Sequence, residues 1–306
     1  LIGFPEVYLT AALTGLYNAI GDSRTPFRIS CVGLVGNMLL DPLFIHTLGW
    51  GVSGAALATV TSQAVVFVLF WQRVRHDHLF GGFPFLVRLQ RSYVLRILQI
   101  GLPVASLQVL FAFVSIYMGR MVSSLGGHIG VATINIGGQL EAITWDTSQG
   151  FGTALAAFVA QNYAARKPQR IFSAFRVSIS ITSVFGIVAM FLYIFFGTEL
   201  FALIIPEEEA YLEGGRYLRA AGCVQLFMMS EILIQGLFYG TGRSLQPALI
   251  SIIGNSIRIP LALIFGAMGF GLVGIWWAIA TSMAVKGVAA VSFLPYLKRT
   301  LHRRLA

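Results

Sequence analysis

Asn37 and Asp41 are polar residues inside a long apolar segment. They are four positions apart, so on a helix both side chains lie on one face. A carboxylate in such a segment costs about 2.5 to 3.5 kcal/mol to insert into a membrane, which makes it a functional candidate by default. Because hard cations prefer oxygen ligands, the pair predicts a site for one cation or proton. The alternative is that Asp41, followed by Pro42 near the end of its helix, is only a cap or turn.

Further charged residues lie within other apolar segments, namely Arg120, Glu141, Asp146, Glu231, Arg258 and Lys286. Glu231, Arg258 and Lys286 are expected to form a buried charge network, because pairing offsets the cost of burying each charge. For Lys286 the alternative is that its amine snorkels to the membrane surface.

Glu141 and Asp146 are five positions apart. This spacing is too wide for one tight acid pair, and both residues are candidates for lining a cavity. Arg120 is the candidate for neutralising either of them. Protonation of one acid would then couple to release of a cation, and structural pairing is the alternative.

Aromatic and glycine residues add weaker signals. Candidates for stacking on cationic compounds are Tyr117, Trp145, Phe151 and Tyr239, although most of the 24 Phe are expected to contact core or lipid. Gly49-x-Gly51-x-x-Gly54 and Gly269-x-Gly271-x-x-Gly274 match the dinucleotide fingerprint by letter. No strand unit precedes them, so tight turns and close helix packing are expected instead. No metal-binding cluster is predicted.

The elements that position these residues follow from composition. The 306 residues are 57% hydrophobic and 11% charged, whereas soluble domains carry roughly 25% charged residues. Apolar runs near the 20 residues that cross a membrane recur throughout the chain. We therefore predict an all-α polytopic membrane protein. The expected helices lie near 7–20, 29–48, 52–71, 97–119, 131–159, 177–196, 217–239, 248–268 and 272–294.

The gaps between the apolar runs alternate: gaps that contain Lys or Arg are followed by gaps that contain neither, as orientation in a membrane requires. The net charge of +9 is therefore read as topology and not as nucleic-acid binding. The pattern predicts an integral protein of the cell membrane with a cytoplasmic C-terminus. Residues 83–96 mix apolar and basic side chains and are expected to form a cytoplasmic amphipathic linker helix. A calmodulin-type target is the alternative.

An internal repeat organises the chain. Gly15-Leu16, Gly21, Ser23, Pro26, Ile29-Ser30 and Gly33 recur 221 residues later, and Gly49, Gly51, Gly54 and Ala58 recur 220 residues later. Six helices fit in one period, so two pseudo-symmetric six-helix lobes are predicted, related by an axis along the membrane normal. Residues 1–82 would be the C-terminal half of the first lobe, and 97–306 the second. Three helices of the first lobe would be missing, and a native nine-helix protein is the alternative.

The repeated block resembles the multidrug and toxic compound extrusion (MATE) transporters. The resemblance rests on Gly15-Leu-Tyr-Asn-Ala-Ile-Gly-Asp-Ser-Arg-Thr-Pro26, Asn37-Met-Leu-Leu-Asp41-Pro and Gly51-Val-Ser-Gly-Ala-Ala-Leu-Ala-Thr59. Gly101-Leu-Pro103 and Val159-Ala-Gln-Asn-Tyr-Ala-Ala165 are similar to second-lobe signatures, although the family usually has Gly before the last Ala. The resemblance implies the fourth to twelfth helices of a twelve-helix transporter.

Several functional expectations follow from this resemblance. It implies a monomeric antiporter, not an enzyme, that exports organic, usually cationic compounds in exchange for Na⁺ or H⁺ and needs no cofactor. Asn37, Asp41 and Thr59 match positions of the family's cation site. The expected partners are small molecules and the lipid bilayer. The alternatives are a flippase for lipid-linked oligosaccharides, whose cavity should be richer in Arg and Lys, and an intramembrane enzyme, for which no nucleophile-base pair is recognised.

Overall fold

The computed structural model describes residues 4–78 and 90–305, and every regular element in these ranges is a helix. The chain forms two compact units, Leu1–Leu89 and Gln90–Ala306, each of which is considered by itself. Seven helices of the described ranges are long and apolar enough to cross a membrane. The all-α membrane fold predicted from the sequence is therefore confirmed.

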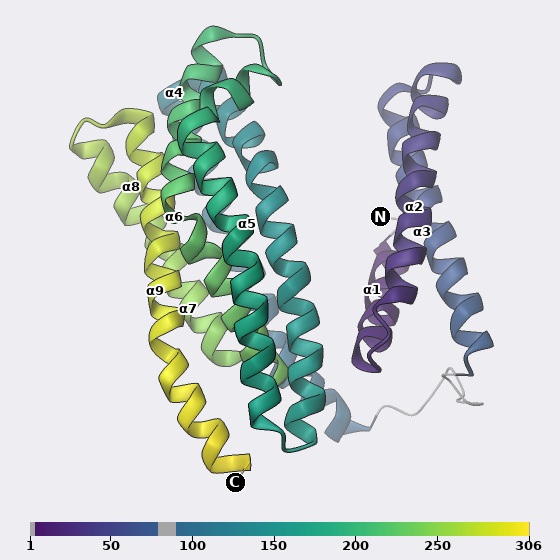
Figure 1. The fold of residues 1–306 in the computed structure, drawn as a ribbon. Helices are drawn as coiled ribbons and strands as arrows, with labels where there is room; N and C mark the ends of the chain where they lie inside the picture. The colour runs from purple at the N-terminus through teal and green to yellow at the C-terminus, as the bar shows by residue number, and fades with distance from the viewer. Residues whose placement is uncertain (1–3, 79–89, 306) are drawn as a thin grey trace. The chain divides into compact units, whose positions relative to one another are not determined.

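The described residues of the N-terminal unit form three long helices and one π-helix (Figure 1). These are α1 (Phe4–Ala19), α2 (Arg24–Pro42), η1 (Leu43–Thr47) and α3 (Gly51–His76). Helices α1 and α2 both pack against α3. Their shared core consists of Leu13, Tyr17, Ile29, Val66, Phe70 and Val74. At Gly33 an added Cβ would collide with Val66, so glycine allows α2 to approach α3 closely.

Helix α2 does not stop at Pro42. It continues directly into η1, where the Leu48 amide donates to the Leu43 carbonyl at 3.0 Å. Pro42 has no amide hydrogen, so it cannot bond the carbonyl of Met38, and the helix is loosened at this point. A helix that runs on past Asp41 means that the cap or turn interpretation of this residue was wrong.

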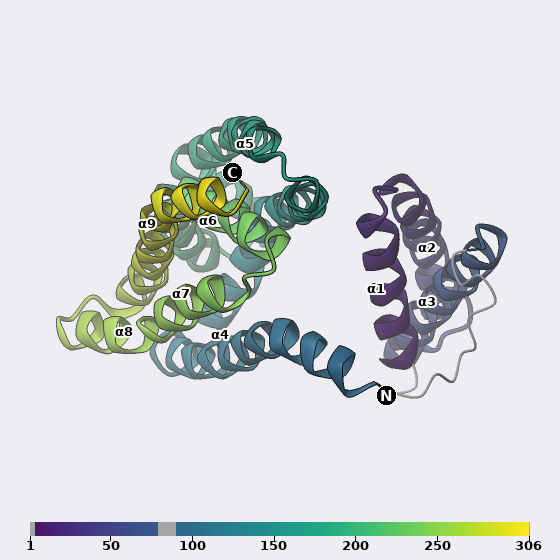
Figure 2. The ribbon, with the colours of Figure 1, turned by 90° about the horizontal axis from the view of Figure 1, so that it is seen from below.

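The C-terminal unit is a bundle around α6 (Glu208–Gly240), which packs against α4, α5 and α9. In Figure 1, α6 lies between α5 and α9, and Figure 2 shows the same arrangement from below. The apolar window of α6 is 72% buried, far more than that of its neighbours. The other helices of this unit are α4 (Arg91–Ala164), α5 (Pro168–Ala202), α7 (Leu245–Ser256), α8 (Arg258–Ala267) and α9 (Gly271–Leu305).

Helix α4 accounts for two of the predicted membrane spans. Its 74 residues would extend about 110 Å at 1.5 Å per residue, far beyond a hydrocarbon core of about 30 Å. Gly127 breaks it with φ 51° and ψ −136°. Each of the nine predicted spans has a helical counterpart among the described residues. The first span corresponds to α1, two spans correspond to the two halves of α4, and one span corresponds to the pair α7 and α8.

The predicted linker helix over 83–96 is only partly visible. Residues 83–89 lie outside the described ranges, and Arg91 to Arg96 form the first turns of α4. No glycine or proline occurs between Arg91 and Ile100, so nothing in the sequence interrupts the helix at the predicted boundary of 96/97.

The internal repeat is reproduced in the backbone. Three pairs of glycines, one from each copy, share the left-handed region with φ between 54° and 88°. These pairs are Gly21 and Gly242, Gly49 and Gly269, and Gly51 and Gly271. Side chains with a Cβ rarely adopt this conformation, which explains why glycine stands at each position. The glycine-rich stretches are therefore tight turns between helices, as the sequence predicted.

Helices α4 and α6 are held together by small residues at four-residue spacing. A Cβ on Gly236 would lie 2.5 Å from the carbonyl oxygen of Gly152, and one on Gly240 would lie 2.5 Å from that of Ala156. Lipid provides no hydrophobic force between helices, so such close backbone packing is a main source of association.

Gly236→Val is expected to destabilise the C-terminal unit by about 3 kcal/mol, because the obstructing atoms are backbone and cannot rotate away. Thermal unfolding of the purified protein in detergent measures the effect. Gly150→Val is the matched control, since an added Cβ at Gly150 meets nothing within 4 Å. Equal unfolding temperatures for the two variants would contradict this account of the α4–α6 contact.

Candidate functional site

The C-terminal unit contains a cavity of about 760 Å³, lined by α4, α6, α7, α8 and α9. This volume lies within the range of pockets that hold small organic ligands. The polar lining includes several amide side chains, namely Gln108, Asn135, Gln149, Gln235 and Asn255. Two of the predicted stacking candidates, Trp145 and Tyr239, also line it, whereas Tyr117 and Phe151 do not.

A buried ion pair joins α6 to α9 at the cavity wall. The Nζ atom of Lys286 lies 3.2 Å from Oε2 of Glu231, and the two side chains are 3% and 2% exposed. The other carboxylate oxygen accepts hydrogen bonds from Gln235 at 2.9 Å and from Ser251 at 2.8 Å. Lys286 is therefore an internal partner of Glu231, and the snorkelling interpretation was wrong.

Arg258, the third member of the predicted network, does not join this pair. Its Nε donates to the Ser282 hydroxyl at 2.8 Å, and its guanidinium carbon lies 5.6 Å from the centre of the Phe111 ring. The residue is 7% exposed and lines the cavity. It begins α8, directly after the break between α7 and α8 at Ile257. Pro260 accounts for the break, because it cannot bond the carbonyl of residue 256.

Glu141, on α4, also lines the cavity. Its Oε2 accepts a hydrogen bond from the Tyr217 hydroxyl at 2.6 Å. The Tyr217 ring packs edge-on against Trp276, with centroids 5.0 Å apart, and the Trp276 indole donates to Glu213 at 2.7 Å. A chain of contacts from α4 through α6 to α9 thus fixes the position of the Glu141 carboxylate.

The structure does not bring Asp146 and Arg120 to this cavity. Both side chains are exposed, and neither belongs to the lining residues. Five positions correspond to about 140° around a helix, so Asp146 points away from the face that carries Glu141. Among the described residues neither forms an ion pair with the other or with Glu141. Of these three charges only Glu141 lines the cavity of the C-terminal unit, and a coupling role for Asp146 and Arg120 stays a prediction.

Sequence reasoning missed four polar residues that hold the charges: Tyr217, Gln235, Ser251 and Ser282. Two of them carried a usable signal, because Ser251 and Ser282 recur from Ser30 and Ser62 in the first copy. Gln235 follows Glu231 by one helical turn, which is the spacing of side chains that contact each other.

The residues of the predicted cation site lie in the N-terminal unit. Asn37 and Asp41 are half-buried on α2, and Thr59 on α3 is exposed and donates to the Ala55 carbonyl at 3.0 Å. The Nδ2 of Asn37 is buried and has no hydrogen-bond partner among the described residues. No hydrogen bond within residues 4–78 joins the three side chains to one another. Their role in cation binding stays a prediction.

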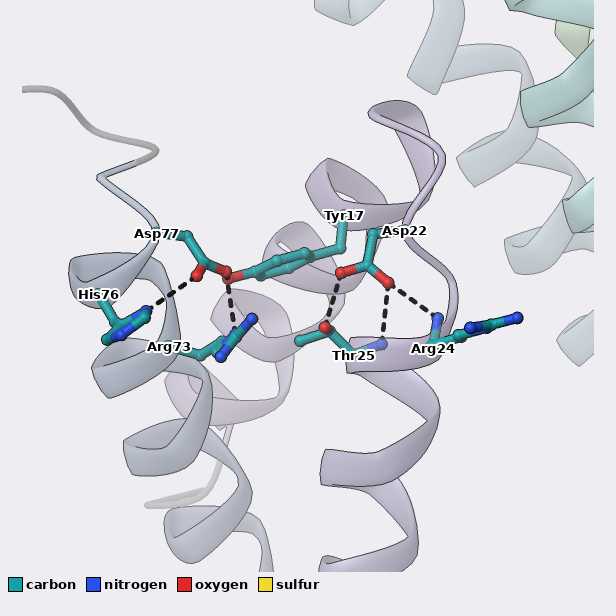
Figure 3. Close-up of polar contacts among 7 residues, drawn as sticks. All are labelled: Tyr17, Asp22, Arg24, Thr25, Arg73, His76 and Asp77. Carbon is teal, nitrogen blue, oxygen red and sulfur yellow. Dashed lines mark hydrogen bonds and ion pairs between the residues drawn. The ribbon is translucent and has the colours of Figure 1, made fainter.

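A second polar cluster fastens the end of α1 to the end of α3 (Figure 3). The Tyr17 hydroxyl donates to Asp77 at 3.0 Å, and the Nε of Arg73 lies 3.0 Å from the same oxygen. The Nδ1 of His76 is 3.1 Å from the other carboxylate oxygen. These bonds lower the pKa of Asp77 below its ordinary value, with the bond to His76 contributing most. Asp77 is thus held in its charged form.

Asp22 performs a similar task at the start of α2, as Figure 3 also shows. Its carboxylate accepts hydrogen bonds from the Thr25 hydroxyl at 2.6 Å and from the amides of Arg24 and Thr25 at 3.1 and 3.2 Å. These bonds, chiefly that from the Thr25 hydroxyl, lower the pKa of Asp22. The first turn of α2 would otherwise leave these amides unsatisfied.

Acid is expected to weaken the N-terminal unit through Asp77. Because the folded-state pKa of Asp77 lies below the unfolded value of about 3.9, its contribution is present above that pH and is lost as the pH falls further. Unfolding temperatures measured between about pH 6 and pH 3 should fall less steeply for Asp77→Asn than for the wild type. Asp146→Asn, at an exposed site, should keep the wild-type slope, and an unchanged slope in Asp77→Asn would refute the assignment.

Comparison with known proteins adds independent information. The MatE family model matches residues 103–264, more than half of the chain, and the model named Lipid II flippase MurJ matches residues 1–123. The chain is 27% identical to "Probable multidrug resistance protein YpnP" of Bacillus subtilis (strain 168), covering 97% of this chain and 69% of that protein. It is 23% identical to "Multidrug export protein MepA" of Staphylococcus aureus (strain N315), covering 96% and 65%.

The fold is also that of solved structures. The chain aligns with the outward-facing conformation of a multidrug resistance MATE family transporter of the MOP superfamily, with a TM-score of 0.86 and 21% identity. The alignment covers 96% of this chain and 67% of that one. The chain thus spans about two thirds of the length of these proteins.

Proposed function

Because the chain belongs to the MatE family, we propose that it acts as a secondary antiporter that exports organic, mainly cationic compounds in exchange for Na⁺ or H⁺. Members of this family are transporters, so no enzymatic role is proposed. The observation that carries the proposal is a cavity of about 760 Å³ in a membrane-helix bundle, with Glu141 and Glu231 in its wall. The names of these relatives, which refer to multidrug resistance and export, support the same substrate class.

We propose that the coupling ion binds in the N-terminal unit, at Asn37, Asp41 and Thr59. Two observations support this assignment. Asp41 is a half-buried carboxylate within a membrane helix, and Asn37, one turn earlier, carries a buried amide that lacks a hydrogen-bond partner among the described residues. An arriving cation or proton would neutralise Asp41 and lower the cost of keeping it in the membrane.

Substrate recognition is assigned to the C-terminal cavity. Organic cations are attracted by carboxylates and by the faces of aromatic rings. The cavity offers Glu141 together with Phe111, Trp145 and Tyr239. The apolar remainder of the wall, such as Met228 and Met283, suits flexible contact with compounds of different shape.

The test is efflux from lipid vesicles that contain the purified protein. An imposed Na⁺ or proton gradient should drive movement of a fluorescent organic cation such as ethidium, and collapse of the gradient with an ionophore should stop it. Efflux at the same rate with and without the gradient would remove the antiport mechanism. Separate Na⁺ and proton gradients decide the coupling ion.

A flippase for lipid-linked oligosaccharides is the second candidate. It is favoured by the MurJ model match over residues 1–123 and by the two buried cations, Arg258 and Lys286, at the cavity. Lys286 is already paired with Glu231, which leaves one guanidinium for a pyrophosphate. Transfer of a fluorescent lipid-linked oligosaccharide across vesicle membranes, without efflux of ethidium, would favour this candidate over export.

The arrangement in the membrane is part of the proposal. The basic gaps at Arg73, Arg166 and Arg243 and the basic tail support a cytoplasmic C-terminus, and the protein is proposed to act as a monomer in the cell membrane. Protease access to a C-terminal tag in sealed cells and in inverted vesicles tests this orientation.

A further inference from the structure

Arg258 is the charged group of the cavity that has no ionic partner. Of the four charged lining residues, Glu231 and Lys286 pair with each other, and Glu141 accepts the Tyr217 hydrogen bond. None of the ion pairs formed by the described residues includes Arg258. Glu141 and Glu231 attract the Arg258 charge from a distance without forming an ion pair with it. A charged residue inside a membrane helix is costly to bury, and such residues mark binding pathways.

The contacts of Arg258 hold its guanidinium still and leave most of its donors available. An arginine presents five N–H donors in a planar fork and stays protonated in proteins. One donor, on Nε, bonds Ser282, while one face of the plane lies over Phe111. The two terminal nitrogens form no hydrogen bond with the residues that the structure describes. Their spacing suits two parallel bonds to a carboxylate or phosphate.

Asn255, which also lines the cavity, provides a second and independent signal. It is 3% exposed, and its Oδ1 is buried without a hydrogen-bond partner among the described residues. An unsatisfied buried polar atom costs free energy, and a ligand that supplies a donor removes that cost. Asn255 precedes Arg258 by only three positions. A ligand whose acidic group binds Arg258 could therefore donate a hydrogen bond to Asn255 from a neighbouring N–H.

The charge is specific to the second copy of the repeat. Arg258 occupies the position of Asn37, and Lys286 that of Val66. The backbone contact around them is conserved between the copies, because a Cβ on Gly33 would meet Val66 and one on Gly254 would meet Lys286. The same helix crossing therefore carries an amide and an apolar residue in one unit, and two cations in the other.

We propose that the cavity binds the acidic group of an amphiphilic compound, with its carboxylate on the Arg258 guanidinium and a neighbouring N–H bonded to Asn255. Phe111, Ile279 and Met283 provide the apolar wall for the rest of the molecule. This proposal rests on the proposed function in taking the cavity as the substrate site, and it adds acidic amphiphiles, held by Arg258, to the organic cations that Glu141 would attract. Binding is measured without a gradient, so a failure of transport and a failure of recognition are distinguishable.

The test compares two probes that differ in one group. Dansylglycine carries a sulfonamide N–H next to a carboxylate, and dansylglycinamide keeps the N–H but has no charge. Both are titrated by fluorescence into the purified protein in phosphatidylcholine nanodiscs, with empty discs subtracted. We expect dansylglycine to bind about tenfold more tightly, as a bidentate charged contact implies. Equal affinities in the wild type would overturn the proposal.

Variants assign the preference to residues. Arg258→Gln should bring the affinity ratio of the two probes close to one, and Arg258→Lys, which keeps the charge without the fork, should give an intermediate ratio. The ratio is taken on one protein sample, so partial misfolding cancels. Arg120→Gln, at an exposed arginine outside the cavity, should keep the wild-type ratio. An unchanged ratio in Arg258→Gln would overturn the proposal.

Two further arms test the donor and the source of the anion. Asn255→Ala should weaken both probes by the same factor, because both carry the N–H, and no loss would remove Asn255 from the site. Nanodiscs that contain phosphatidylglycerol, whose headgroup is anionic where that of phosphatidylcholine is zwitterionic, test whether an anionic lipid takes the place of a free amphiphile. If the preference for dansylglycine is lost in these discs, a lipid headgroup and not a free compound occupies Arg258, and the proposal of a free amphiphile is overturned.

Discussion

Asp41→Asn is expected to reduce gradient-driven efflux of ethidium to the level of vesicles without protein. The substitution keeps the size and hydrogen-bonding capacity of the side chain but removes its charge. An amide does not take up a proton near neutral pH, and it holds a hard cation less strongly than a carboxylate does. Without that exchange, the imposed gradient has no group in the N-terminal unit on which to act.

The measurement is the initial rate of ethidium efflux under a Na⁺ or proton gradient, at equal protein content. Asp146→Asn is the matched control, because Asp146 is exposed and lies outside the cavity. It should transport at the wild-type rate. If Asp41→Asn also transported at that rate, the coupling site in the N-terminal unit would be refuted, while substrate binding to the C-terminal cavity would remain open to test.

Lys286→Met is expected to destabilise the C-terminal unit by about 3 to 5 kcal/mol, because it leaves the Glu231 carboxylate buried and unpaired. Methionine preserves the length of the stem that packs against Gly254. The double variant Glu231→Gln with Lys286→Met removes both charges and should recover most of the loss. Gln235 and Ser251 remain in place to bond the new amide.

Thermal unfolding of the single and double variants in detergent measures this coupling. Lys298→Met, on the exposed face of α9, is the control and should have the unfolding temperature of the wild type. A double variant as unstable as Lys286→Met would mean that the stem of Lys286, and not its charge, stabilises the helix crossing.

The sequence was sufficient for the helices but not for the partners of the buried charges. Apolar runs and alternating basic gaps depend on local composition, which is why each predicted span has a helical counterpart among the described residues. Whether Glu231 pairs with Lys286 or with Arg258 depends on how α6, α7, α8 and α9 cross, which is a property of packing. The sequence identified Glu231, Arg258 and Lys286 as buried charges, but it could not show which of them form an ion pair.

Glu141 and Asp146 illustrate the same limit on one helix. Both are acids within an apolar span, and composition treats them alike. The face that α4 presents to the bundle is set by contacts such as Gly152 with Gly236, far along the chain. Such contacts place Glu141 in the cavity wall and leave Asp146 exposed.

The π-helix after Pro42 explains a small mismatch between the two copies of the repeat. Gly33 and Gly49 are sixteen positions apart, whereas their counterparts Gly254 and Gly269 are fifteen apart. A π-turn closes its hydrogen bond over one residue more than an α-turn. An insertion in the first copy, or a deletion in the second, is thus absorbed within Leu43–Thr47. The length change is confined to one widened turn, and the glycine turn that follows keeps its conformation.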